Sequence, residues 1–242
     1  MISISFPTVA AVAKDAAPLE AEGVLKKRAA RIVRVLAKTY PDAECALRHR
    51  NPFELLIATI LAAQCTDDKV NEVTAVLFER YPSPAALARA KPATVEQLVH
   101  ATGFFRQKAK SIQATSRDLV EHFGGEVPGT LEELVTLRGV ARKTANVVLG
   151  NCFGVPGLAI DTHMKRVNGR LGLTANADPV KIERDLSALI PRKHWTDYTH
   201  RVIRHGRVCC DAKRPDCEAC PLAAACPWPE GAGADSPKRK LS

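Results

Sequence analysis

The chain of 242 residues has no long hydrophobic run. Its longest apolar stretch, residues 55–63, contains Thr59 and falls well short of the roughly 18 residues that a membrane helix needs. The first residues lack the basic leading region of a secretory signal peptide, and Pro7 interrupts their apolar stretch. We therefore expect a cytoplasmic protein without a membrane span, in which residues 1–22 form a disordered extension.

Sustained alternation of apolar and polar residues, the pattern of strands, is absent, and so is a repeat of fixed period. Helical spacing recurs instead, and a nearly all-apolar run after Asn51-Pro52 predicts a buried central helix. Further helix starts are predicted from capping patterns at Ser83, Thr94, Thr130 and Asp178. Helix ends are predicted at Gly103, Gly124, Gly150 and Gly172. The sequence thus predicts an all-α fold with short loops.

Cysteine is sparse except in one short segment. Three of the eight cysteines are scattered, whereas five lie between Cys209 and Cys226. A disulfide framework is expected to spread across a chain, so this clustering indicates a metal site. The spacing C-x6-C-x2-C-x5-C selects four candidate ligands, with Cys209 as a bystander: Cys210, Cys217, Cys220 and Cys226.

Zinc and a [4Fe–4S] cluster both accept four cysteine thiolates, so the ligand count leaves both open. Zinc sites typically pair two C-x2-4-C units, and only one such pair is present, which favours iron–sulfur. Lys213 and Arg214 lie in the loop that Cys210 and Cys217 enclose, where they could face DNA phosphates. The alternative for these two residues is an exposed basic loop without a partner.

Positive charge exceeds negative charge, with a formal net charge of +9. Such an excess suits a polyanionic partner, because lysine and arginine release counterions when they meet phosphates. Simple solubility explains the charge equally well, so it carries little weight alone. Residues 231–242 include Pro-Lys-Arg-Lys and have the composition of a flexible basic tail.

Residues 131–149 predict a helix, a turn centred on Gly139, and a second helix that starts near Arg142. The backbone N–H groups of such a turn and the second helix's N-terminus together form a site for a phosphate, so Gly139, Ala141 and Arg142 are predicted DNA contacts. This is the layout of a helix–hairpin–helix, which binds the DNA backbone without reading sequence. An ordinary corner between two helices is the alternative.

Two side chains are candidates for chemistry. Lys143 falls in the first turn of the second hairpin helix, where the helix field and Arg142 favour a neutral, nucleophilic amine. The alternative is a solvated surface lysine. Asp161, in AIDTHMKRV, is predicted to cap a helix, and a capping carboxylate stays ionised and rigidly held. Capping need not exclude a catalytic role.

The chain resembles the endonuclease III family of DNA glycosylases over residues 24–226, in the order and spacing of NPFELLIATILAAQCTD, LRGVARKTANVVL, AIDTHMKRV and the four-cysteine loop. The resemblance implies two helical domains with a DNA-binding cleft between them. One six-helix domain would cover residues 45–155 and contain the helix–hairpin–helix. The other, holding a [4Fe–4S] cluster, would combine residues 23–44 with 156–230.

The resemblance also implies an activity. Lys143 matches the family's catalytic lysine, Asp161 its catalytic aspartate, and Gln64 the residue that fills the gap left by an extruded base. Phe104 stands where a leucine wedge is usual. The expected enzyme is a monomer of the bacterial cytoplasm, associated with the nucleoid. It would remove oxidised pyrimidines from double-stranded DNA and cut abasic sites by β-elimination.

The hairpin departs from the family's Leu-Pro-Gly-Val-Gly, because Arg138 replaces the proline and Ala141 the second glycine. Alanine would cost roughly 1 kcal/mol or more if position 141 required a positive φ. Other hypotheses are an adenine-mismatch glycosylase, which lacks the lysine, and an 8-oxoguanine glycosylase, which lacks the cluster. A non-catalytic DNA-binding module with structural zinc would need neither Lys143 nor Asp161.

Overall fold

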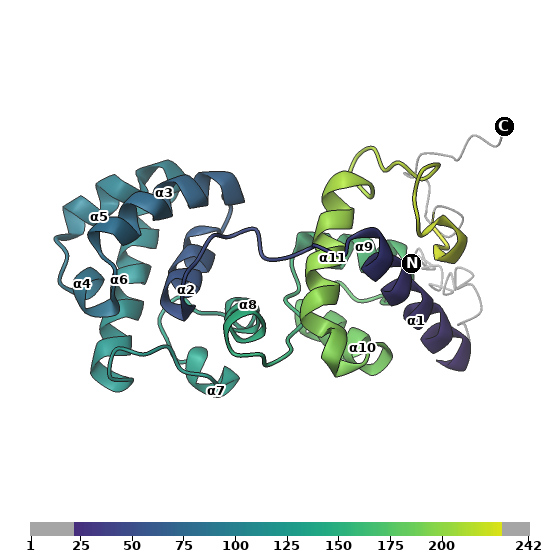
Figure 1. Cartoon of the computed structure of the whole chain (residues 1–242), viewed down its shortest axis with the longest axis horizontal. Coiled ribbons are helices and arrows are strands. Elements are labelled where there is room, and N and C mark those ends of the chain that lie inside the picture. The colour runs from purple at the N-terminus through teal and green to yellow at the C-terminus, as the bar shows by residue number, and fades with distance from the viewer. Residues whose placement is uncertain (1–21, 229–242) are drawn as a thin grey trace, which may run out of the picture.

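The structure, a computed structural model, describes residues 22–228, which form helices and loops with no strand among them (Figure 1). The all-α prediction is thus confirmed. The predicted N-terminal extension and basic tail lie outside the described residues, apart from Glu22, where the first helix begins. The α-helices are α1 (Glu22–Thr39), α2 (Pro52–Leu61), α3 (Asp67–Arg80), α4 (Pro84–Ala88), α5 (Pro92–Val99), α6 (Phe105–His122), α7 (Leu131–Leu134), α8 (Arg142–Cys152), α9 (Thr162–Arg170), α10 (Pro179–Leu189) and α11 (Trp195–Val208).

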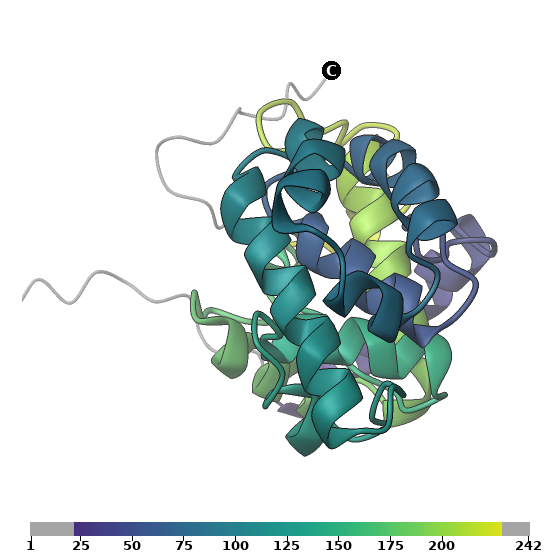
Figure 2. The same cartoon turned by 90° about the vertical axis from the view of Figure 1, so that its left-hand side faces the viewer.

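The helices enclose two separate hydrophobic cores. The first core uses buried residues between Leu47 and Leu149, from α2 to α8. The second combines α1 with residues between Leu158 and Ala225, so the N-terminal helix packs beside α10 and α11 (Figure 1). Figure 2 shows the same molecule with the first group of helices facing the viewer. The two groups of helices meet at a boundary between the two cores, and residues from both groups lie there.

Helix α2 is the centre of the first core. Its residues 53–61 are all buried, as its apolar run predicts. The side chain of Asn51 accepts a hydrogen bond from the backbone N–H of Glu54 at 2.9 Å. The Glu54 carboxylate in turn accepts one from the backbone N–H of Arg50 at 2.7 Å. The Asn51 cap starts the helix at the predicted residue, and Glu54 binds the backbone of the residue just before the cap.

Capping side chains likewise start α4, α7 and α10, at Ser83, Thr130 and Asp178. The predicted start at Thr94 is wrong, because α5 begins at Pro92. Proline suits the first turn, where its missing N–H has no helical partner.

The predicted helix end at Gly150 is also wrong, because α8 continues through it to Cys152. A Cβ at Gly150 would lie 2.6 Å from the Thr196 hydroxyl oxygen, so glycine allows α8 and α11 to approach closely. At this position glycine serves helix packing and does not act as a helix terminator.

Candidate active site and DNA interface

The turn before α8 has the geometry of an anion site. Gly139 has a φ of +83°, which glycine adopts without a steric penalty. Ala141 is the N-cap of α8 with φ −91° and ψ 165°, and its side chain makes no capping hydrogen bond. The first N–H groups of α8 are therefore available to a phosphate. Because Ala141 is extended, alanine fits this position without the strain considered above.

Two side chains of helix α6 fix the turn by hydrogen bonds to its backbone. The Thr115 hydroxyl donates to the Arg138 carbonyl oxygen at 2.5 Å, and the Asp118 carboxylate accepts from the Arg138 backbone N–H at 3.1 Å. A proline at position 138 would have no N–H for this second bond. The replacement of proline by Arg138 therefore exchanges a rigid ring for a hydrogen bond that fixes the same segment.

A cavity of about 570 Å³ lies where the two groups of helices meet. Lys143 lines it from the first turn of α8, and Asp161 lines it from the start of α9. The two candidate catalytic side chains, which belong to different helices, thus face one cavity. Its volume falls within the usual range for pockets that hold a small organic group.

The position of Asp161 is set by its capping role. Its Oδ1 accepts a hydrogen bond from the backbone N–H of Met164 at 2.7 Å. The predicted cap is therefore confirmed. The residue is partly exposed and lines the cavity as well, so capping leaves the carboxylate accessible.

Polar residues that the sequence analysis did not single out share the cavity. The Arg207 guanidinium lies 2.5 Å from the Asp67 carboxylate, an ion pair between the two groups of helices. His200 Nε2 lies 2.9 Å from Asn151 Oδ1, and burial lowers the pKa of His200, which favours a neutral ring. Asp67 lies within a segment quoted for the family resemblance, whereas no pattern pointed to His200.

Arg142, a predicted DNA contact, is bound within the protein. Its Nε and one terminal nitrogen donate to the two carboxylate oxygens of Glu183, both at 2.8 Å. Glu183 belongs to α10, so this bidentate pair joins the hairpin to the second group of helices. For the Arg142 guanidinium to contact a phosphate, it would have to use its remaining N–H groups or break its hydrogen bonds to Glu183.

Gln64 and Phe104, the predicted base-replacing residues, share an unusual backbone conformation. Their φ values are 53° and 46°, and they are the only non-glycine residues with positive φ within residues 22–228. Gln64 is exposed, and Phe104 has 69% of its surface exposed. Strained conformations persist where the surrounding structure enforces them, and they are frequent at functional sites.

The loop that carries Lys213 and Arg214 is shaped by a neighbouring carboxylate. Asp211 Oδ1 accepts hydrogen bonds from the backbone N–H groups of Lys213 at 2.8 Å and of Arg214 at 2.9 Å. These bonds lower the pKa of Asp211, which therefore stays ionised. Both basic residues are exposed, as a phosphate contact requires.

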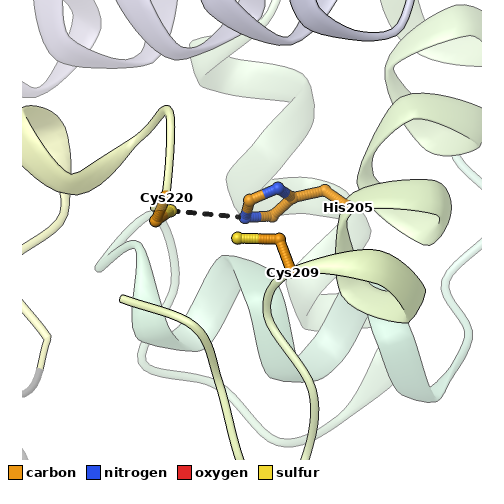
Figure 3. Close-up of side chains that lie close together, drawn as sticks. All are labelled: His205, Cys209 and Cys220. Atoms are coloured by element: carbon orange, nitrogen blue, oxygen red, sulfur yellow. Dashed lines mark hydrogen bonds between the residues drawn. The ribbon is translucent and has the colours of Figure 1, made fainter. Parts of the chain in front are cut away.

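The cysteine loop gathers around one small pocket. Five cysteines line it, together with His205 and apolar residues: Cys209, Cys210, Cys217, Cys220 and Cys226. Burial raises the pKa of Cys226, and the nearby thiols raise it further. Thiolates brought this close need a cation to offset their charge, so the donor set fits a metal centre. Within the described residues, His205, Cys209 and Cys220 have ligand atoms within 4.8 Å of one another (Figure 3).

Arg170 fastens this loop to α9. Its guanidinium donates to the Cys210 sulfur at 3.2 Å and to the carbonyl oxygens of Asp211 and Ala212 at 2.6 and 2.9 Å. A charged donor beside sulfur stabilises the thiolate that a metal requires.

Comparison with known proteins shows which family this chain resembles. Residues 57–192 match the HhH-GPD superfamily base excision DNA repair protein family. An endonuclease III of Synechocystis sp. is 54% identical over 203 residues, which cover 84% of this chain and 93% of the relative. An endonuclease III of Bacillus subtilis is 46% identical and covers 77% of this chain and 86% of the relative.

Solved structures of endonuclease III have a similar fold. A non-covalent endonuclease III–DNA complex superposes with a TM-score of 0.80 at 44% identity, over 83% of this chain and 94% of that one. A trapped covalent endonuclease III–DNA intermediate gives the same score and identity, over 83% of this chain and 95% of that one. The chain belongs to the endonuclease III family, within the HhH-GPD superfamily of base excision repair proteins. It is a DNA glycosylase and abasic-site lyase of the base excision repair class. None of the helices in residues 22–228 combines the length and the apolar content that a membrane span requires.

Proposed function

We propose that Lys143 and Asp161 are the catalytic pair of this glycosylase/lyase, and that its substrates are oxidised pyrimidines and abasic sites. The observation that carries the proposal is the shared cavity, which both side chains line from helices of different cores. A non-catalytic DNA-binding module would not need an amine and a fixed carboxylate to face one cavity at the boundary of two cores.

A stacked base is out of reach of any side chain, so the damaged nucleotide must leave the duplex. Gln64 and Phe104 are suited to occupy the vacated stack, because both are exposed and held in a left-handed conformation. The hairpin turn around Gly139 and the first N–H groups of α8 would bind a backbone phosphate. Lys213 and Arg214 would add phosphate contacts from the cysteine loop.

In the chemical step, the nitrogen lone pair of Lys143 attacks C1′ of the extruded nucleotide. The C1′–N bond breaks, its electron pair leaves with the base, and the base takes up a proton. The Asp161 carboxylate stabilises the positive charge that develops on the sugar. The lysine nitrogen then gives up one proton. The C1′–O4′ bond breaks, O4′ keeps its electron pair and takes up a proton, and a protonated imine forms between Lys143 and C1′. Loss of a proton from C2′ then expels the 3′ phosphate, which cuts the strand.

We infer that Cys210, Cys217, Cys220 and Cys226 would hold a [4Fe–4S] cluster with a structural role. The four thiols line one pocket, and the Arg170 guanidinium beside Cys210 favours a thiolate. The cluster would tie the end of the chain to α9, while the proposed base excision needs no electron transfer.

Residues 45–155 and the combination of 23–44 with 156–230 would be the two domains. The enzyme would act as a monomer at the bacterial nucleoid.

The test of the lysine assignment is trapping with borohydride, which reduces the imine to a stable covalent bond. The native chain should yield a covalent protein–DNA adduct on abasic-site DNA, and Lys143→Gln should yield none. Lys165→Gln is the matched control, because Lys165 is an exposed lysine on α9 that does not line the cavity. Equal trapping by the native chain and Lys143→Gln would refute the assignment.

A further inference from the structure

His205 brings an imidazole next to two thiols of the cysteine loop. Its Nε2 lies 3.8 Å from the Cys220 sulfur, and Cys209 completes a group whose ligand atoms all lie within 4.8 Å of one another (Figure 3). Cys209 was a bystander in the four-cysteine pattern, yet its side chain belongs to this group. The arrangement offers one nitrogen and two sulfurs to a single point in space.

The orientation of the ring is fixed from its other side. The Tyr40 hydroxyl lies 3.0 Å from Nδ1 of His205, and only 1% of the histidine's surface is exposed. With the proton on Nδ1, the tyrosine oxygen accepts a hydrogen bond from Nδ1–H, and the Nε2 lone pair is free to face the Cys220 sulfur. A histidine that binds a metal typically makes such an outer hydrogen bond, which sets its tautomer.

We propose that His205, Cys209 and Cys220 form a zinc site that is an alternative to the iron–sulfur centre. Imidazole and thiolate are the usual zinc ligands, and a water molecule or another thiolate can fill the fourth tetrahedral position. Ligand atoms around zinc lie roughly 3.3–3.8 Å apart for the usual bond lengths, so a contraction of about 1 Å would complete the site. Because Cys220 is common to both sets, zinc and the cluster exclude each other.

This proposal extends the inferred metal role of the cysteine loop and is independent of the lysine chemistry. The experiment uses the full chain from cells grown with limiting iron and added zinc. Zinc and iron per chain would be measured, together with X-ray absorption at the zinc edge. Mixed coordination is expected, with sulfur at about 2.3 Å and nitrogen at about 2.0–2.1 Å.

Two serine variants separate the ligand sets. Cys209→Ser should lower zinc affinity at least about tenfold, since loss of an outer-shell partner alone costs that much, and should keep its iron when iron is plentiful. Cys226→Ser should show the reverse, with zinc retained and iron lost. Thermal melts of both variants would establish that each is folded, and iron-loaded Cys209→Ser gives an independent check of folding.

Three results would overturn the proposal: zinc surrounded by sulfur alone, zinc binding unaffected by Cys209→Ser, or no bound zinc. The first two would assign zinc to the four-cysteine set. Borohydride trapping by the same preparations reports on Lys143 separately. A failure of the zinc site is therefore distinguishable from a failure of the proposed catalytic assignment.

Discussion

Asp161 combines two roles that a substitution can separate. Asp161→Asn keeps an oxygen that can accept the Met164 N–H, so the free energy of unfolding should change by well under about 1 kcal/mol. The charge opposite a cationic sugar is lost, and removal of one such electrostatic partner typically slows a reaction on the order of 100- to 1000-fold. Abasic-site cleavage should suffer less, because no base has to leave.

Single-turnover rates on a damaged base and on an abasic site, beside a thermal melt, would measure these effects. Thr162, next in the chain, is exposed, and Thr162→Ser provides a control at the same helix start. Near-normal base excision by folded Asp161→Asn would reduce the residue to a helix cap.

Gln64 allows backbone strain and side-chain function to be measured apart. Gln64→Ala removes the side chain and keeps the strained φ of 53°, whereas Gln64→Gly removes both. A left-handed alanine costs roughly 1–2 kcal/mol, and glycine loses about 0.5–1 kcal/mol of chain entropy. The glycine variant should therefore be the more stable by about 0.5–1 kcal/mol.

Both Gln64 variants should lose base excision to the same extent, because both lack the group that replaces the base. Denaturant unfolding gives the stability difference, and excision rates on duplex DNA give the functional loss. An alanine variant with native excision rates would argue against a gap-filling role.

At the scale of elements, Gly150 sets how closely α8 approaches α11. Gly150→Ala would place its Cβ 2.6 Å from the Thr196 hydroxyl oxygen and 2.9 Å from its methyl group. Overpacking of this kind typically costs about 1–3 kcal/mol of stability. Because α8 carries Lys143, the lyase rate should fall as well.

Gly169→Ala on α9 is the matched control, since nothing lies within 4 Å of its Cβ position. Alanine there should be neutral or stabilise by up to about 1 kcal/mol, because alanine is the better helix former. Thermal melts of the two variants would test the contrast, and equal stability of both would remove the close-packing explanation.

At the scale of the whole molecule, two ion pairs among residues 22–228 connect the groups of helices: Arg142 with Glu183, and Arg207 with Asp67. The Arg142 pair is bidentate and lies next to Lys143, so we expect it to hold the hairpin against α10. Arg142→Ala and Glu183→Ala should then be non-additive, with a coupling energy of about 0.5–1 kcal/mol in unfolding.

The salt dependence of DNA binding tests the rival role for Arg142. As a phosphate contact, its loss would reduce the salt slope by about 1. If Arg142 acts only through its ion pair with Glu183, its loss would leave that slope unchanged. Strictly additive stability effects together with a reduced slope would favour the DNA contact over the ion-pair role.

The helices could be predicted from the sequence, because their signals are local. Asn51, Ser83, Thr130, Asp161 and Asp178 each cap a helix three residues from the N–H that they bind, and such short-range hydrogen bonds are encoded in the spacing. The family's motifs also identified Lys143 and the cysteine loop as candidates. Local patterns failed at Thr94, where Pro92 started the helix earlier.

The contacts that these residues make with distant parts of the chain could not be predicted in this way. Gly150 resembles a helix end in the sequence, but contact with Thr196 on another helix explains it. The pairing of Arg142 with Glu183, the cavity that joins Lys143 to Asp161, and the proximity of His205 to Cys209 and Cys220 all depend on packing between distant segments. Spacing along one helix fixes which side chains share a face, whereas the packing of the whole chain fixes which faces meet.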